Sequence, residues 1–259
     1  MQRIKVAVLG AGGRMGREVT RSIEADPDLE LVAAVDPASA GFLTESGIQI
    51  SEDIGVVAQA GADVAVDFTH PDAVVENALF CLDRGIHVVI GTTGIDREGL
   101  ERVENACTKA NAFVAPNFSI GAIVMTHICS KYAKYFDRVE VIEMHHDQKA
   151  DAPSGTAVRT AEILASARPD GWPDDSATTK ELFEGARGAV VEGVRVHAVR
   201  LPGLVADQMV VFGAMGQTLT VWHRTTDRSS FMPGVLLAIK EVGKLKGLTV
   251  GLEKLLGLE

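Results

Sequence analysis

The chain has 259 residues, of which 46% are hydrophobic and 23% are charged, and this balance excludes an intrinsically disordered protein. This length suits one large domain or two ordinary ones. A chain of this size buries enough surface on folding to need no disulfide or metal for stability. With 25 basic against 35 acidic residues, the formal net charge is −10, which argues against nucleic acid or an anionic membrane as a partner.

The cysteines and the N-terminal residues indicate a soluble protein of a reducing compartment. Cys81, Cys107 and Cys129 form no CxxC or Cys/His spacing, which argues against a disulfide framework or a structural zinc ion. The first residues lack the apolar core and cleavage site of a signal peptide, and no run approaches ~18 apolar residues. We therefore expect a cytoplasmic protein with no membrane partner.

The first half of the chain alternates short apolar runs with helical segments. We expect strands at residues 4–9, 29–35, 62–68, 86–90 and 113–115, and helices at residues 17–25, 72–84 and 97–110. Because consecutive strands joined by helices pair in parallel through right-handed crossovers, this rhythm predicts a doubly wound parallel α/β sheet.

Past residue 118 the rhythm changes. We expect helices at 120–133, 156–167 and 231–244, and strands at 138–143, 194–201, 205–212 and 218–224. Apolar and polar residues alternate from Val194, which favours an antiparallel sheet with one buried and one polar face. The prediction is a Rossmann-like domain of residues 1–118, completed by 229–259, with an inserted α+β domain of residues 119–228 that contains a mixed or antiparallel sheet.

A glycine-rich turn, residues 10–16 (GAGGRMG), joins the first strand to the first helix. In such a turn the backbone N–H groups and the helix dipole favour a pyrophosphate. The turn has glycines at 10, 12, 13 and 16, and their spacing is best described by Gly10, Gly13 and Gly16, because Met15 occupies the third glycine position of the common dinucleotide fingerprint. Asp36 ends the second strand, where a carboxylate can accept from ribose hydroxyls; the alternative is a solvated turn residue before Pro37.

Two further loops, residues 91–94 (GTTG) and 115–118 (APNF), follow the fourth and fifth strands. Both are predicted at the carboxyl edge of the sheet, where open α/β sheets bind ligands, although either loop taken alone is better explained as a simple connection.

The stretch 143–157 (EMHHDQKADAPSGTA) is the densest in chemically reactive groups. His145 and His146 can exchange protons near neutral pH, and Lys149 supplies a cation that suits a carboxylate. Ser154 opens a helix whose first amides can bind an anion. The alternatives are two surface histidines and a simple helix cap. No metal site is expected, because adjacent histidines on a strand face opposite sides and no third ligand is suitably spaced.

The motifs GAGGRMG, DFTHP (residues 67–71), GTTG, APNFSIG and EMHHDQKADAPSGTA together resemble the dihydrodipicolinate reductase family of bacterial lysine biosynthesis. They occur in family order over nearly the whole chain. The resemblance implies reduction of a cyclic dicarboxylate by NAD(P)H with loss of water, a nucleotide domain that closes over a substrate domain, and a homotetramer built through the substrate-domain sheets. After hydride transfer, an enamine is left that must be protonated.

The resemblance also implies roles for individual residues. His145 would be the proton donor and Lys149 a second donor. Asp36 would bind the adenosine ribose, and the pyrophosphate would be held by Gly10, Ala11, Gly12, Gly13, Arg14 and Met15. The nicotinamide side would be lined by Gly91, Thr92, Thr93, Ala115, Pro116, Asn117 and Phe118. The substrate would be bound by His146, Ser154, Gly155 and Thr156.

The cofactor expectation follows from Asp36 and Pro37. Some family members carry an arginine after the ribose-binding acid, where it meets the 2′-phosphate of NADPH, whereas Pro37 cannot. We therefore expect NADH to be preferred and NADPH also to be used, with Arg14 as the opposing cation. Two alternatives are another two-domain NAD(P)-dependent dehydrogenase, which would not need the HHxxK and SGT combination, and a non-catalytic NAD(P)-binding redox sensor.

Overall fold

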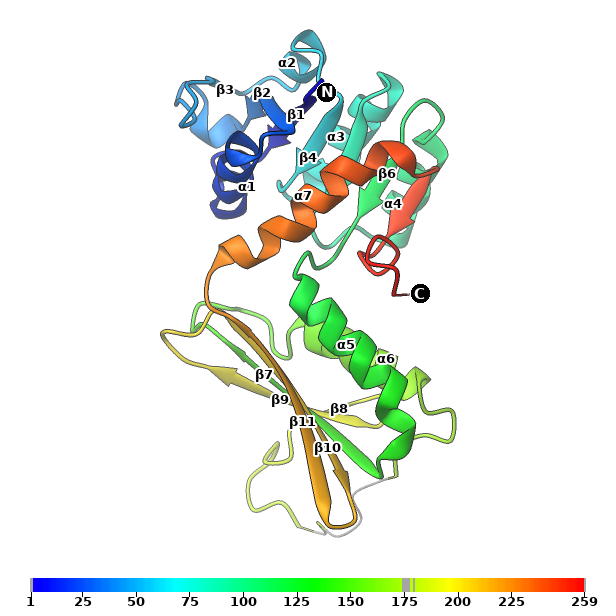
Figure 1. The fold of residues 1–259 in the computed structure, drawn as a ribbon. Helices are drawn as coiled ribbons and strands as arrows, with labels where there is room; N and C mark the ends of the chain where they lie inside the picture. Colours follow the sequence, from blue (N-terminus) through cyan, green and yellow to red (C-terminus); the bar gives the residue numbers. More distant parts are fainter. Residues whose placement is uncertain (1, 174–177, 179, 259) are drawn as a thin grey trace. The chain divides into compact units, whose positions relative to one another are not determined.

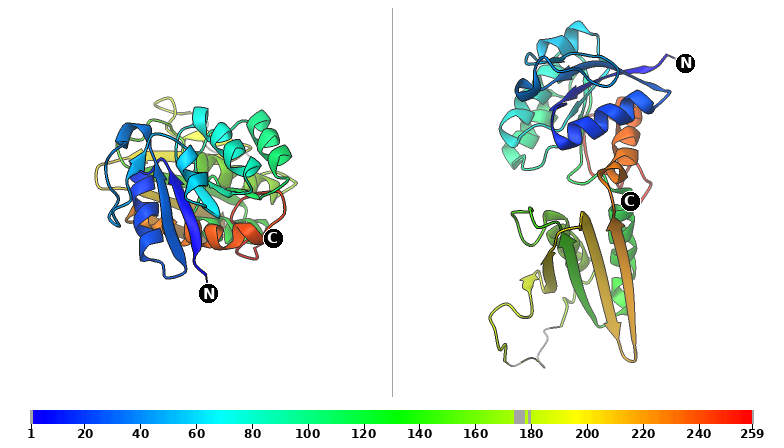
Figure 2. Two further views of the ribbon diagram at one scale, coloured as in Figure 1. Left: turned by 90° about the horizontal axis from the view of Figure 1, so that it is seen from above. Right: turned by 90° about the vertical axis from the view of Figure 1, so that its left-hand side faces the viewer.

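The computed structural model describes residues 2–173, 178 and 180–258, and these form two compact units (Figure 1). Unit 1 contains the described residues up to Ser119 and those from Phe231 onward, and unit 2 contains Ile120–Ser230. The C-terminal segment therefore returns to the unit in which the chain begins, as the colouring of Figures 1 and 2 makes clear.

Unit 1 is built on a sheet of seven strands in the order β12-β6-β5-β4-β1-β2-β3. Its strands are β1 Ile4–Leu9, β2 Leu29–Val35, β3 Ile50–Ser51, β4 Val64–Asp67, β5 His87–Ile90, β6 Ala112–Val114 and β12 Leu248–Val250. Every neighbouring pair is parallel. The central strands are almost wholly apolar and buried, as expected for a sheet covered on both faces.

Helices pack on both faces of this sheet (Figures 1 and 2). They are α1 Arg14–Ala25, α2 Gly55–Gln59, α3 Pro71–Asp83, α4 Arg97–Ala106 and α7 Met232–Glu241. Helix α7 contacts α1, and Lys240 of α7 pairs with Asp26 at 2.8 Å and with Asp28 at 2.9 Å. These two ion pairs join the C-terminal segment to the turn between α1 and β2.

Unit 2 is a mixed sheet in the order β11-β10-β7-β9-β8. Its strands are β7 Arg138–His145, β8 Ala189–Val191, β9 Val194–Arg200, β10 Ala206–Ala214 and β11 Gln217–Thr225, and its helices are α5 Ile120–Tyr132 and α6 Gly155–Ser166. Strands β7 and β9 pair in parallel, whereas the other pairs are antiparallel. The parallel pair arises because α6 lies in the connection from β7 to β9, which is the arrangement of a crossover.

One face of the unit 2 sheet packs against the helices. Its core contains Val141, Val196 and Phe212, which are 0–1% exposed, together with Ala161 and Leu164 of α6. Because side chains alternate along a strand, Glu143 and His145 of β7 share the helix-covered face with Val141. The two residues thus lie at the carboxyl end of β7, on the side toward α6.

The fold agrees with the predicted α/β class, and the differences are helix ends and short elements. Helix α1 begins at Arg14 rather than at residue 17, and α4 ends at Ala106 rather than at residue 110. The sequence patterns miss β3, β8, β12 and α2, which have two, three, three and five residues and are too short to show a period. Helix α7 ends at Glu241, and the predicted last turn is a 3-10 helix, Val242–Lys244. Three more 3-10 helices are Pro37–Ser39, Ala133–Tyr135 and Arg228–Phe231.

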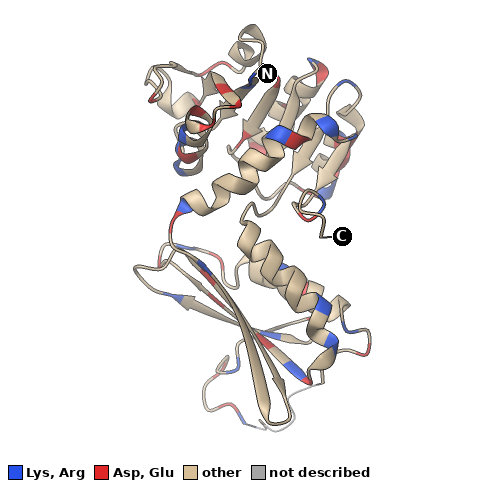
Figure 3. Cartoon of the chain, in the orientation of Figure 1, with Lys and Arg blue, Asp and Glu red and all other residues tan. Residues whose placement is uncertain are grey.

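The charged residues are distributed over both units, with acidic and basic side chains interspersed along helices and loops (Figure 3). Within the described part of the chain, no helix has both the length and the apolar character that crossing a bilayer requires.

Candidate active site

The glycine turn after β1 is shaped by close backbone contacts. Gly10 has φ +79°, and a Cβ there would lie 2.5 Å from the carbonyl oxygen of Phe68. At Gly16 a Cβ would lie 1.9 Å from the carbonyl oxygen of Gly10. Any side chain at this position would therefore prevent the first turn of α1 from packing against the glycine turn. Both positions therefore require glycine for reasons of space, and at Gly10 also for backbone conformation.

Helix α1 begins without a capping side chain, because its N-cap is Gly13, and its first turn carries no acidic residue. Backbone N–H groups at a helix start that no side chain caps attract an anion, and the helix dipole adds to this attraction. The turn that includes Gly12, Arg14 and Met15 thus has the chemistry of a pyrophosphate site, so the residues present fit a dinucleotide.

Asp36 connects the glycine turn to the segment after β2. Its Oδ2 accepts from the backbone N–H of Gly12 at 2.9 Å, and its Oδ1 accepts from that of Ala38 at 2.9 Å. A carboxylate has about four acceptor positions, so two remain for ribose hydroxyls. Next to it lies a cavity of about 430 Å³, lined by Ala11, Arg17, Thr20, Arg21, Ser39, Phe42, Leu43, Thr44, Glu45 and Ile50. The Asp36 carboxylate therefore caps the turn that begins at Pro37, and its hydrogen bond with Gly12 holds it beside the glycine turn.

A second carboxylate, Asp67 at the end of β4, organises the loop after β5. It is 0% exposed and accepts from the hydroxyls of Thr69 at 2.6 Å and Thr92 at 2.8 Å, and from the Asn77 amide at 2.9 Å. The Thr92 hydroxyl therefore points into the interior, and Thr93 is exposed. The sequence indicated Asp67 only as part of the DFTHP motif, and its partners follow from the fold.

The loop after β6 is anchored by an aromatic cluster. Phe118 is 3% exposed, and its ring centroid lies 5.9 Å from that of Phe68 and 6.1 Å from that of Phe113. Gly91 lies beside the same cluster, since a Cβ there would be 2.2 Å from the Phe68 ring. Ala115 is buried and Pro116 exposed. The predicted nicotinamide-side residues thus all belong to unit 1, in loops that follow adjacent strands.

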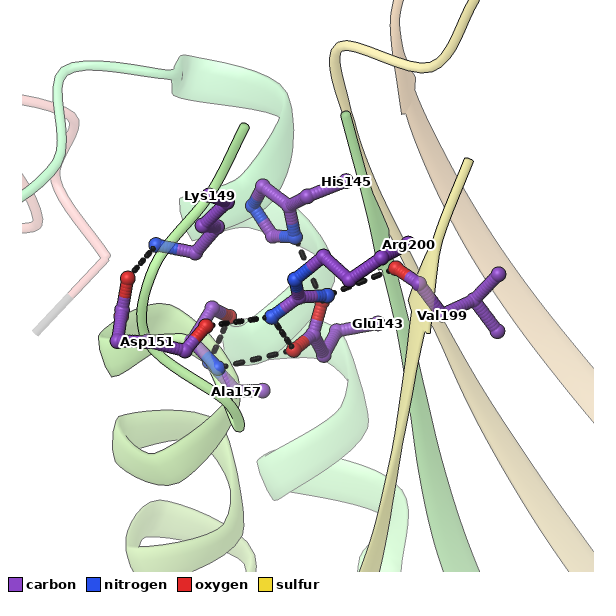
Figure 4. Close-up of polar contacts among 8 residues, drawn as sticks. Glu143, His145, Lys149, Asp151, Ala157, Val199 and Arg200 are labelled. Atoms are coloured by element: carbon purple, nitrogen blue, oxygen red, sulfur yellow. Dashed lines mark hydrogen bonds and ion pairs between the residues drawn. The ribbon is translucent and has the colours of Figure 1, made fainter. Parts of the chain in front are cut away.

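In unit 2, a buried carboxylate lies at the centre of a hydrogen-bonded cluster (Figure 4). Glu143 is 0% exposed, and its Oε2 is 2.6 Å from Nδ1 of His145. Arg200, at the end of β9, donates from Nη1 to Oε2 and from Nη2 to Oε1, both at 2.8 Å. The backbone N–H of Ser154 donates to Oε1 at 3.0 Å. Neither Glu143 nor Arg200 was among the predicted site residues.

The charge state of Glu143 is set by these partners. Burial alone would raise its pKa, but the hydrogen bonds from His145 and Arg200 outweigh burial and lower the pKa from 4.5 to about 2. Glu143 is therefore a carboxylate at neutral pH, and it can only accept hydrogen bonds.

His145 and Lys149, the two predicted proton donors, both belong to this cluster, His145 through Glu143 and Lys149 through Asp151, whose carbonyl accepts from Arg200 (Figure 4). The side chain of His145 is 15% exposed and that of Lys149 is 21% exposed. Lys149 donates to Oδ1 of Asp151 at 2.6 Å, and this hydrogen bond lowers the pKa of Asp151. The cluster thus combines an imidazole and an ammonium group that both remain accessible.

The start of α6 adds backbone donors to the cluster. The Oγ of Ser154 accepts from the N–H of Ala157 at 3.2 Å, so Ser154 is the N-cap of the helix, and it is 2% exposed. Gly155 is exposed, and nothing lies within 4 Å of where its Cβ would be. Thr156 and His146 are half-buried. The alternative interpretation of Ser154 as a helix cap is therefore correct. The cap also fixes Gly155 and Thr156 in the first turn of α6.

The chain matches known proteins over almost its full length. Two family models match it, one described as dihydrodipicolinate reductase, N-terminus, over residues 4–118, and the other as dihydrodipicolinate reductase, C-terminus, over residues 121–256. It is 48% identical to the 4-hydroxy-tetrahydrodipicolinate reductase of Mycolicibacterium smegmatis (98% of this chain, 100% of the relative) and 49% identical to that of Moorella thermoacetica (98% of each). A solved structure, dipicolinate-bound dihydrodipicolinate reductase from Paenisporosarcina sp. TG-14, matches with a TM-score of 0.86 and 39% identity over 98% of this chain and 99% of that one.

The lowered pKa of Glu143 predicts a pH-dependent contribution to stability. Because the folded-state pKa lies below the ordinary value of 4.5, the stabilisation is fully present above that pH and is lost as the pH falls toward 2. The shift corresponds to about 3 kcal/mol. We expect Glu143→Gln to lower the free energy of unfolding at pH 7, with a difference from the unsubstituted protein that narrows as the pH falls to about 2.

Urea unfolding followed by tryptophan fluorescence measures this difference, since Trp172 and Trp222 both belong to unit 2. Glu162→Gln is the control, because Glu162 forms only a partly exposed ion pair with Arg159 at 3.3 Å and should change stability little at any pH. A pH-independent difference for Glu143→Gln would contradict the assigned charge state.

Proposed function

The chain belongs to the dihydrodipicolinate reductase family, and from this membership we propose how its own residues carry out the reaction. It catalyses the reaction of a 4-hydroxy-tetrahydrodipicolinate reductase, an oxidoreductase of lysine biosynthesis that uses a nicotinamide cofactor. In this proposal, unit 1 binds the cofactor and unit 2 binds the substrate and associates with other copies. The single observation that carries the catalytic assignment is the cluster of His145 and Lys149 beside the start of α6.

The substrate is a cyclic dicarboxylate, a class to which the dipicolinate bound in the similar solved structure also belongs. We assign its carboxylates to His146, Lys149 and the backbone of Gly155 and Thr156. Lys149 brings a positive charge, and the start of α6 brings N–H groups and the positive end of its dipole. Ser154 acts through its cap, which orients these amides.

His145 is the proposed proton donor. A bound NAD(P)H supplies the hydride. His145 is accessible, and its Nε2 has no hydrogen-bond partner among the described residues, so this nitrogen is open to a substrate. Lys149 offsets the negative charge of the bound substrate and, once released from Asp151, serves as a second donor.

We propose a cytoplasmic enzyme, which agrees with the state of its cysteines. Burial raises the pKa of the Cys81 and Cys129 thiols to about 12, so both remain protonated and unreactive. All three cysteines are free, which suits a reducing compartment.

Substitution separates the two proposed donors. His145→Gln removes the acid at similar volume, so kcat should fall about a hundred- to ten-thousand-fold with little change in KM. Lys149→Ala should lower kcat and raise KM, and His146→Gln should mainly raise KM. The assay couples the purified protein to the upstream synthase with pyruvate and aspartate semialdehyde and follows NADH absorbance.

His197→Gln is the matched control for His145→Gln. His197 lies on the neighbouring strand β9 and also contacts a glutamate, Glu140, at 2.7 Å, but it lies on the opposite face of the sheet. Because His197 pairs with Ile142 on that face, the mass of the variant in solution is checked by light scattering, and at unchanged mass it should keep normal turnover. Near-normal turnover of His145→Gln would identify another group as the acid.

We propose that NADH is preferred over NADPH. Asp36 offers its remaining acceptor positions to ribose hydroxyls, whereas a 2′-phosphate would meet its negative charge. Pro37 supplies no donor there. Two cations oppose this effect, namely Arg14 of the glycine turn and Arg17, which lines the adjacent cavity with Ser39. Asp36 is hydrogen-bonded to the glycine turn, so its carboxylate has a fixed position from which it repels a 2′-phosphate. Both arginines are exposed, so solvent weakens their attraction for that phosphate.

The expected result is a higher kcat/KM for NADH than for NADPH, with a shift toward NADPH in Asp36→Ser. Each tenfold change in the ratio corresponds to about 1.4 kcal/mol. Asp53→Ser is the control, because Asp53 caps a turn through Gly55 at 2.8 Å in the same way but lies outside the proposed site. A clear preference of the unsubstituted enzyme for NADPH would contradict the role given to Asp36.

We further propose a homotetramer built through the sheet of unit 2. On the face of this sheet away from α5 and α6, a row of apolar side chains crosses three strands: Ile142 pairs with Met209, and Met209 with Trp222. Together with Val211 these residues form what we call the open face. Trp222 is 50% exposed and the other three are half-buried. An apolar sheet face of this kind is stabilised when a second copy covers it.

Light scattering at micromolar concentrations should give the mass of four chains. Trp222→Lys, which places a charge on the open face, should lower that mass. Met215→Lys is the control, because Met215 is 95% exposed and lies in the turn between β10 and β11. A monomer mass for the unsubstituted protein would refute the assembly.

A further inference from the structure

Glu143 and Arg200 form a buried ion pair that contacts the proposed acid directly. Glu143 is 0% exposed, and both its oxygens are occupied by Arg200, with Oε2 also bonded to Nδ1 of His145 at 2.6 Å. Arg200 is itself fixed, because Nη1 donates to the carbonyl of Val199 and Nη2 to that of Asp151, both at 2.7 Å. The carboxylate is therefore held in one plane, and the imidazole is held by the carboxylate.

This contact determines which nitrogen of His145 faces the substrate. An ionised carboxylate can only accept, so Nδ1 must carry the hydrogen of the short contact. Nε2 is then the nitrogen that gains and loses the exchangeable proton.

We propose that Glu143 is a positioning residue for His145, and that Arg200 acts through Glu143, a role that rests on the proposed proton donation by His145. Nε2–H of His145 gives its proton to a carbon of the reduced substrate, and Nε2 is reprotonated from water. Nδ1 keeps its hydrogen throughout and donates it to Oε2 of Glu143. Arg200 balances the charge of Glu143, so that the carboxylate can stay ionised without contact with water.

The same carboxylate also links the acid to the substrate-binding turn. Its Oε1 accepts from the N–H of Ser154, the cap of α6, at 3.0 Å. One group thus fixes both the imidazole that supplies the proton and the helix start assigned to the substrate carboxylate. Misplacement of Glu143 should therefore affect the relative position of acid and substrate.

A second Glu–His–Arg cluster on the same strand provides a matched control. Glu140 of β7 contacts His197 at 2.7 Å and Arg187 at 2.6 Å. Glu140 lies on the opposite face from Glu143 and is 33% exposed. The two clusters have the same residue types, and only the one with Glu143 touches the proposed acid.

A double-mutant cycle tests the role. Glu143→Gln should lower kcat about ten- to a hundredfold, with a smaller change in KM and an unchanged Kd for NADH. In a His145→Gln background the same change should alter kcat less than about twofold, because its effect passes through His145. Glu140→Gln, with its tetramer mass checked, should turn over as the unsubstituted enzyme does.

Nitrogen NMR of histidine-labelled protein gives a readout that a merely structural role would not move. The His145 signals are assigned by their loss in His145→Gln. In the unsubstituted enzyme the neutral imidazole should carry its hydrogen on Nδ1, and in Glu143→Gln the population should shift toward the tautomer with hydrogen on Nε2. Glu140→Gln should leave the His145 signals unchanged.

Arg200→Lys covers the case in which Glu143→Gln does not fold. Lysine keeps the charge but cannot bind both carboxylate oxygens in a planar fork, so kcat should fall about three- to tenfold, again only when His145 is present. Additive losses in the cycle, or an unchanged tautomer in Glu143→Gln, would overturn the positioning role. Near-normal turnover of His145→Gln would instead overturn the proton donation on which it rests.

Discussion

A buried carboxylate must have partners, and in unit 2 this requirement fixes the position of nearly every group in the site. Glu143 has no contact with water, so its charge is tolerable only with donors on both oxygens. Those donors come from three places in the chain: Arg200 at the end of β9, the amide of Ser154 at the start of α6, and His145 beyond Glu143 on β7. The strand ends and the helix start are therefore joined through one side chain.

Carboxylates play a similar part in unit 1. The parallel sheet brings the carboxyl ends of its strands to one edge. Without side-chain contacts, the loops that follow these strands would be held there only by their own backbone. Asp36 joins the glycine turn to the segment after β2, and Asp67 joins β4, α3 and the loop after β5. In both cases an acidic residue at a strand end accepts from groups of different segments, so the loops are set before any ligand arrives.

The two units use their buried polar groups for different purposes. The contacts of Asp67 with Thr69 and Asn77 are hydrogen bonds from uncharged donors, and they shape a loop. The cluster around Glu143 instead joins a full ion pair to an accessible imidazole, and the carboxylate lowers its own cost of burial by binding Arg200 with two hydrogen bonds. Glu140 shows that the same residue types on the other face of β7 make a half-exposed cluster with no contact to the proposed acid.

The sequence by itself determined the α/β class, most of the longer elements, the glycine turn and the family, because periodicity, glycine spacing and a fifteen-residue motif are local properties of the chain. It also placed His145 and Lys149 four residues apart, at a strand end and in the loop that follows. Only the tertiary structure brought Arg200 to Glu143 across 57 positions, and Thr92 to Asp67 across 25. The parallel pairing of β7 with β9, which aligns the ends of those strands, decides the first of these contacts. Partners so far apart in sequence leave no local pattern, since they are chosen by the packing of strands and helices.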